Sequence, residues 1–141
     1  MNYWLLKTEP EAFGYDDLVR LGKDRWNGVR NFTALKNIKQ MQPGDRAFIY
    51  HTGKEKAIVG VAEIVTSSYP DPEFQDNRWM VVDVAPLYRL KNPVSLKTVK
   101  TSPAFTGWLL ISQPRLSVMP VAEEHWKLVH DLSTDEYPFG I

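Results

Sequence analysis

Two tryptophans stand where an aromatic ring can hold a flat ligand. Trp26 and Trp79 each follow an arginine, and each lies at the boundary of an expected element, where a ring can project into a groove. A ring at a pocket wall stacks on a nucleobase with about 1–3 kcal/mol, and a neighbouring guanidinium adds a cation–π or phosphate contact. We therefore expect both rings to face one cavity. Trp4, Trp108 and Trp126 have apolar neighbours and are expected in the core.

Polar side chains near expected strand and helix ends can read the edge of such a base. The candidates for hydrogen bonding to its Watson–Crick edge are Asn31, His51, Thr52 and Ser117. The candidates for holding phosphate are Lys7, Arg30 and Arg115. A histidine satisfied within the protein at a strand end explains His51 equally well. The pocket can accept only a base outside the helical stack, so a base of duplex DNA must first be extruded.

Motifs of common enzymes and metal sites are absent from the sequence. It contains no Gly-x-Gly-x-x-Gly, Walker A, Gly-x-Ser-x-Gly or His-Glu-x-x-His motif, and no cysteine. His125 and His130 are five residues apart on one expected helix, so they point to different faces and do not form a metal-binding pair. We therefore expect no catalytic residue, no metal and no cofactor.

The composition is that of an ordinary globular protein. The chain has 141 residues, 43% hydrophobic and 24% charged, which predicts one domain over residues 1–141. The formal net charge is zero, which excludes binding of nucleic acid through global positive charge. Six basic residues against one acid in 18–40, and five acids against one lysine in 121–141, predict an anion-attracting end. Two solvated helix faces of opposite charge explain this asymmetry equally well.

The location expected from the sequence is intracellular. No apolar run approaches the roughly 20 residues of a membrane span, and the first residues do not resemble a signal peptide. The lack of cysteine fits a reducing compartment. We expect a soluble cytoplasmic protein, or a nuclear one in a eukaryote.

Hydrophobic periodicity and turn residues predict an α+β fold. The expected strands are 2–8, 46–52, 57–66, 79–90 and 116–121, and the expected helices are 15–22, 31–41, 95–100 and 123–132. The order does not alternate as strict βαβ units, which disfavours a Rossmann-like layout. We expect antiparallel pairing of the central strands and closure into a small barrel with flanking short helices.

Several segments together resemble the EVE domain family, which is similar to PUA, ASCH and YTH domains. The resemblance covers nearly the whole chain and is carried by segments 3–10 (Tyr-Trp-Leu-Leu-Lys-Thr-Glu-Pro), 16–18, 26–31 (Trp-Asn-Gly-Val-Arg-Asn), 43–45, 50–52 (Tyr-His-Thr), 69–72 and 115–118 (Arg-Leu-Ser-Val). It implies a PUA-like mixed β-barrel. It also implies a nucleic-acid partner carrying a modified base, with modified cytosine in DNA the leading candidate. The pocket residues implied by the resemblance are Lys7, Trp26, Asn31, His51, Thr52, Trp79, Arg115 and Ser117.

The sequence departs from the family pattern at four positions. Thr52 stands where serine is usual, Asn27 where aspartate is common, Lys36 in place of an arginine, and Met119 where glutamine is frequent. If that amide reads a base edge, Met119 exchanges a hydrogen bond for an apolar contact.

Two other functions remain open. One is an RNA-binding or protein-interaction module on the same fold, because a 2′-hydroxyl contact has no sequence pattern. The other is a small hydrolase of modified nucleosides similar to ASCH domains, with Lys7 and Glu9 as its candidate residues.

Overall fold

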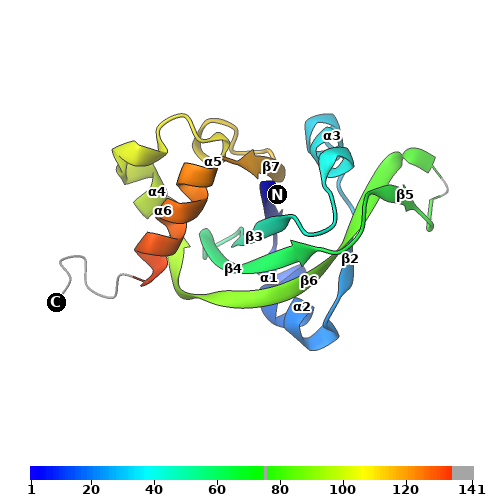
Figure 1. Cartoon of the computed structure of the whole chain (residues 1–141), viewed down its shortest axis with the longest axis horizontal. Coiled ribbons are helices and arrows are strands. Elements are labelled where there is room, and N and C mark those ends of the chain that lie inside the picture. The colour runs from blue at the N-terminus through cyan, green and yellow to red at the C-terminus, as the bar shows by residue number, and fades with distance from the viewer. Residues whose placement is uncertain (75, 135–141) are drawn as a thin grey trace.

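A curled mixed sheet with short helices around it forms the fold (Figure 1). The computed structural model describes residues 1–74 and 76–134, so the end of the expected domain, 135–141, lies outside the described residues. The strands are β1 (Tyr3–Thr8), β2 (Asp24–Trp26), β3 (Arg46–His51), β4 (Ala57–Ile64), β5 (Tyr69–Asp71), β6 (Asp76–Ser95) and β7 (Val118–Val121). The helices are α1 (Pro10–Phe13), α2 (Tyr15–Leu21), α3 (Phe32–Gln40), α4 (Leu96–Thr101), the 3₁₀ turn η1 (Pro103–Phe105), α5 (Leu109–Ser112) and α6 (Glu123–Thr134). The expected α+β class and mixed β-barrel architecture are confirmed, with the sheet curled into a half-barrel.

The strands are ordered β2-β6-β4-β3-β1-β7, and β5 pairs with β6 beside this path. The expected antiparallel pairing is confirmed for β3 with β4 and for β4 with β6. β1 instead runs parallel to β3, because two helices, β2 and α3 lie between them in the chain and allow a crossover. Figure 1 shows α4, α5 and α6 together near one end of the sheet, and the β5–β6 arm projecting at the opposite end.

Local signals account for most element boundaries. Asn31 caps α3 by accepting a hydrogen bond from the backbone N–H of Ala34 at 3.0 Å, as its position predicts. Gly22 ends α2 in the left-handed conformation, with φ of 78°. The helix α1 was not predicted separately, because four residues are too short to show a helical period.

The core lies between the curled sheet and the helices. Trp4, Trp108 and Trp126 are buried, as predicted. Gly60 of β4 lies directly against the ring of Tyr15, and a Cβ at this glycine would come within 2.6 Å of that ring. This close approach lets α2 settle on the sheet next to the end of β3.

Met119, the departure from a frequent glutamine, lies in the core. Its side chain is fully buried in β7, where Met119 pairs with Leu5 of β1. The substitution therefore changes core packing and leaves the polar surface unchanged. In residues 1–74 and 76–134, no helix has both the length and the apolar character that crossing a membrane requires.

Candidate functional site

A cavity of about 340 Å³ opens between the end of β1, the helix α1 and the loop that follows β2. We call it the Trp26 cavity. Its lining includes Lys7, Phe13, Trp26, the loop 27–30 and Ser117. The volume falls within the roughly 300–1,000 Å³ typical of small-molecule sites.

Trp26 forms a rigid wall of this cavity. It ends β2 opposite Val82 of β6, and its side chain is only 7% exposed. The ring of Phe13 meets the indole edge-on, with centroids 6.1 Å apart and planes at 82°. Because both rings are held by their packing, the wall is formed before any ligand arrives.

Lys7 and Ser117 lie side by side at another wall. The backbone N–H of Lys7 donates to the carbonyl of Ser117 at 2.9 Å, which joins the end of β1 to the segment before β7. The Lys7 ammonium donates to the carbonyl of Pro114 at 2.8 Å and lies 5.6 Å from the Tyr50 ring centroid. Burial lowers the pKa of Lys7 from its ordinary value. For the Ser117 hydroxyl, no hydrogen-bond partner is found among the described residues.

Arg30 reaches the cavity from the loop after β2, and two aromatic rings hold it there. Its guanidinium carbon lies 4.4 Å from the Trp79 ring centroid and 5.0 Å from that of Phe74. Its Nη1 also donates to the carbonyl of Val29 at 3.0 Å. Contacts of this type are worth about 0.5–1 kcal/mol at exposed sites, so the two rings restrict where the arginine points.

Trp79, expected as a second wall, is not part of the cavity lining. It lies in β6, and its ring contacts two guanidinium groups, those of Arg30 and Arg78, the latter 5.3 Å from the centroid. The two indoles therefore do not face each other across one cavity, and Trp79 reaches it only through Arg30. Trp79 lies near the start of the long strand β6, three residues before Val82, which pairs with Trp26.

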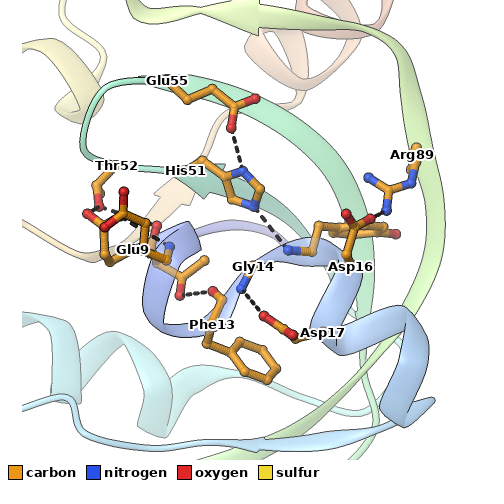
Figure 2. A network of polar contacts seen from close by, with 12 residues as sticks. Glu9, Phe13, Gly14, Asp16, Asp17, His51, Thr52, Glu55 and Arg89 are labelled. Atoms are coloured by element: carbon orange, nitrogen blue, oxygen red, sulfur yellow. Dashed lines mark hydrogen bonds and ion pairs between the residues drawn. The ribbon is translucent and has the colours of Figure 1, made fainter.

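His51 and Thr52 lie in a separate cluster of polar contacts, shown in Figure 2. The His51 Nε2 accepts the backbone N–H of Tyr15 at 3.0 Å, which leaves the ring proton on Nδ1, 2.8 Å from a carboxylate oxygen of Glu55. The Thr52 hydroxyl lies 3.2 Å from a Glu9 carboxylate oxygen and 3.3 Å from the carbonyl of residue 8. We call His51, Thr52, Glu9, Tyr15 and Glu55 the His51 network. Their polar groups join β3, the start of α1, α2 and the β3–β4 turn.

The last two candidates lie outside the cavity as well. Asn31 uses its side-chain oxygen as the cap of α3, and Arg115 is exposed in the turn before β7. Of the nine candidates, the structure brings four together around the Trp26 cavity: Lys7, Trp26, Arg30 and Ser117. The others are Asn31, His51, Thr52, Trp79 and Arg115.

The profile of the EVE domain family matches residues 2–132 of the chain. The chain belongs to the EVE domain family. This confirms the resemblance found in the sequence. Thymocyte nuclear protein 1 of Rattus norvegicus is 32% identical, and the match covers 96% of this chain and 75% of that protein.

Solved structures of similar proteins share the fold of this EVE domain. Rpa0253 of Rhodopseudomonas palustris is 39% identical, with a TM-score of 0.91 over 100% of this chain and 99% of the other. Human THYN1 protein, solved in complex with 5-methylcytosine-containing DNA, is 29% identical, with a TM-score of 0.87 over 97% of this chain and 100% of the other. An ASCH protein of Zymomonas mobilis, 12% identical with a TM-score of 0.56 over 94% and 99% of the two chains, shares the fold alone.

The two candidate residues for hydrolysis have different partners in this EVE domain. Lys7 donates to the carbonyl of Pro114, whereas the Glu9 carboxylate accepts hydrogen bonds from the hydroxyl of Thr52 and the backbone N–H of Glu11. Glu9 is also the N-cap of α1. In the part of the chain that the structure describes, no cluster of His, Asp and Glu has the geometry to hold a metal ion.

Sequence reasoning missed Phe13, which completes the wall beside Trp26. It placed a turn at 27–30 and named Arg30, but it did not predict that residues 27–29 also line the cavity. The Asn27-Gly28 pair was a usable signal, because Gly28 adopts a positive φ of 81° and turns the chain back sharply. Phe13 had no signal of its own, since it follows a proline in a helix too short to recognise.

Proposed function

We propose that this EVE domain is a DNA-binding module that captures one modified cytosine, extruded from the stack, in the Trp26 cavity. The observation that carries the proposal is the placement of Trp26, Lys7 and Arg30 around one preformed hollow. The complex of human THYN1 protein with 5-methylcytosine-containing DNA supplies the ligand class. Since the proposed ligand is DNA, the module would work where DNA is present in the cell.

Each wall has a proposed task. The indole of Trp26 stacks on the face of the base, and the hydroxyl of Ser117, which has no partner among the described residues, hydrogen-bonds to its edge. Lys7 and Arg30 contact the phosphates on either side of the extruded nucleotide. Arg115, exposed in the turn before β7, is a further phosphate contact.

Burial of a 5-methyl group accounts for the expected selectivity. Phe13 and Trp26 give the cavity an apolar wall. Burying one methyl contributes about 0.8 kcal/mol, which is roughly a fourfold preference over unmodified cytosine. Extrusion from a duplex costs a few kcal/mol, so a single strand with the same base should bind more tightly than the duplex.

The test is a titration of oligonucleotides carrying unmodified, methylated or hydroxymethylated cytosine at one position. The wild-type domain should prefer one modified form, and Trp26→Leu should remove that preference while retaining the fold. Trp79→Leu is the matched control, because it removes an indole that does not line the cavity. Equal binding of all three oligonucleotides by the wild type would contradict the proposal.

We propose further that the domain is not an enzyme. The separate partners of Lys7 and Glu9 favour structural roles for both, and the ASCH likeness concerns the fold alone. Incubation with a panel of modified nucleosides should yield no product by chromatography. RNA as the ligand remains the second candidate, and competition between matched RNA and DNA strands decides between the two.

A further inference from the structure

Two further depressions continue from the Trp26 cavity across the surface. The first, about 320 Å³ in volume, shares Lys7 with the cavity and is also lined by Lys56 and Lys100. The second, about 480 Å³, shares Lys56 and Lys100 with the first and adds Lys54 and Lys97. The shared lining residues make the three hollows neighbours on the surface. We call the part beyond the cavity the lysine groove, defined by these five lysines.

The groove carries positive charge that the protein itself does not neutralise. Glu55 is the acidic residue in its lining, and a Glu55 carboxylate oxygen is engaged by His51 Nδ1 at 2.8 Å. Among residues 1–74 and 76–134, no ion pair reaches the side chain of any groove lysine. Elsewhere the opposite holds, since Arg20 pairs with Asp17 and Lys127 with Glu123. The groove is therefore a local site of anion attraction on a chain of zero net charge.

One of these lysines is held in an unfavourable backbone conformation. Lys56 has a φ of 46°, the left-handed region that glycine and asparagine tolerate best. Its carbonyl accepts the backbone N–H of Leu96 at 2.8 Å, which fixes the β3–β4 turn against the start of α4. A glycine would satisfy the same backbone contact without strain. A lysine at a strained position, with its side chain lining both depressions, points to a functional role of that side chain.

We propose that the lysine groove binds the sugar–phosphate backbone of the strand on one side of the captured base. The inference rests on the proposed function, because the base in the Trp26 cavity fixes where the strand begins. Lys7 borders both the cavity and the groove, so it marks the step from the base to the next phosphates. Beyond it the groove offers ammonium groups one after another, which match a chain with one negative charge per nucleotide. The groove contributes affinity without reading sequence.

The first test removes charge from the groove without touching the cavity. Lys97→Gln with Lys100→Gln changes two exposed lysines of α4. Binding of a short single strand with one methylated cytosine should weaken on the order of tenfold, and the slope of log K against log salt should fall by about 1.4, or about 0.7 per lost contact. The preference for methylated over unmodified cytosine should not change. The matched control, Arg20→Gln with Lys127→Gln, removes two charges that lie outside the groove and should bind as the wild type does.

The second test asks on which side of the base the strand runs. Two oligonucleotides carry the methylated cytosine at the 5′ end or at the 3′ end, so that the strand extends in only one direction. The Lys97→Gln, Lys100→Gln variant should weaken binding of one of them and leave the other at the wild-type value. Equal weakening of both, or of neither, overturns the proposed track.

The third test uses the strained lysine. Lys56→Gly should raise the melting temperature, because it removes the left-handed strain, and should weaken binding of the same oligonucleotide. Unchanged binding would remove Lys56 from the track.

The failures of the two proposals are distinguishable. If the wild type prefers methylated cytosine and the Lys97→Gln, Lys100→Gln variant keeps the wild-type salt slope, the groove is wrong and the cavity stands. If the wild type shows no preference while the lysine variant loses affinity, the groove holds phosphate but the modified-base function is wrong.

Discussion

The Trp26 cavity and the His51 network are built from similar residues. They differ in whether the hydrogen-bonding groups of those residues already have partners within the protein. In the network, the ring of His51 and the hydroxyl of Thr52 already have partners within the protein (Figure 2). In the cavity, Ser117 lines the hollow, and its hydroxyl has no partner among the described residues. Polar residues whose hydrogen bonds are satisfied internally hold the fold together, and those with unused capacity beside a cavity can bind a ligand.

The largest expected effect comes from His51. His51→Ala leaves the buried N–H of Tyr15 without an acceptor and removes the contact with Glu55, so the free energy of unfolding should fall by roughly 2–3 kcal/mol. Urea denaturation measures this loss. The folded fraction should keep the wild-type preference for the methylated oligonucleotide, with a modest loss of overall affinity because Glu55, which lines the lysine groove, loses its partner. A loss of binding with unchanged stability would mean that His51 belongs to the site.

Substitution of Trp26 should have a smaller effect than that of His51. It should lower both the affinity for the oligonucleotide and the free energy of unfolding. Trp26→Phe keeps a ring at the wall but reduces the stacking area, so affinity should fall about fivefold to tenfold, within the 1–3 kcal/mol that stacking contributes per base. Isothermal titration with single strands measures it. Affinity equal to that of the wild type would argue that the base does not contact this ring.

Removing one hydroxyl from each region gives a direct comparison of the two. Ser117→Ala should weaken binding by about 1 kcal/mol and leave the unfolding free energy nearly unchanged, because its hydroxyl has no protein partner that the structure describes. Thr52→Val should do the reverse, with a loss of stability of about 0.5–1 kcal/mol, because its hydroxyl contacts Glu9. Thr52 lines the first depression of the lysine groove, but its hydroxyl is already bonded within the protein, so binding should change little. Measuring both quantities for both variants tests the distinction. The same behaviour in the two would abolish it.

The smallest expected effect is that of Trp79. Trp79→Leu removes one of the two rings that hold Arg30, so binding should weaken by about 0.5 kcal/mol, or roughly twofold. The variant should lose affinity equally for methylated and unmodified cytosine, because Arg30 is proposed to contact phosphate. Loss of the methyl preference alone would instead place Trp79 in contact with the base.

Much of the fold could be predicted because its signals are local. The Asn31 cap, the Gly22 helix end and the apolar runs of β1, β3 and β4 each depend on a few neighbouring residues. The parallel pairing of β1 with β3 depends on a crossover and left no local trace. The short helix α1, which contains Phe13, was missed because four residues are too few to show a helical period.

The candidate site could be predicted only in its residue types. The sequence identified Lys7, Trp26, Arg30 and Ser117 but also five residues with equally suitable side chains that lie elsewhere. It associated positive charge with residues 18–40, whereas the structure places a basic groove between the β3–β4 turn and α4. Lys54, Lys56, Lys97 and Lys100 are too far apart in the chain to appear as one cluster.

The sequence by itself determined the family, the elements and the inventory of groups able to stack, donate and carry charge. Only the tertiary structure decided which of those groups remain free. The reason is physical: the type of a side chain fixes how many hydrogen bonds and contacts it can make, but chain segments that meet in space decide how many the protein uses. From the sequence, His51 and Ser117 were equally suitable candidates for hydrogen bonding to a base. The N–H of Tyr15 and the carboxylate of Glu55 occupy both ring nitrogens of His51. Ser117 lies beside a cavity, where its hydroxyl is available to a ligand.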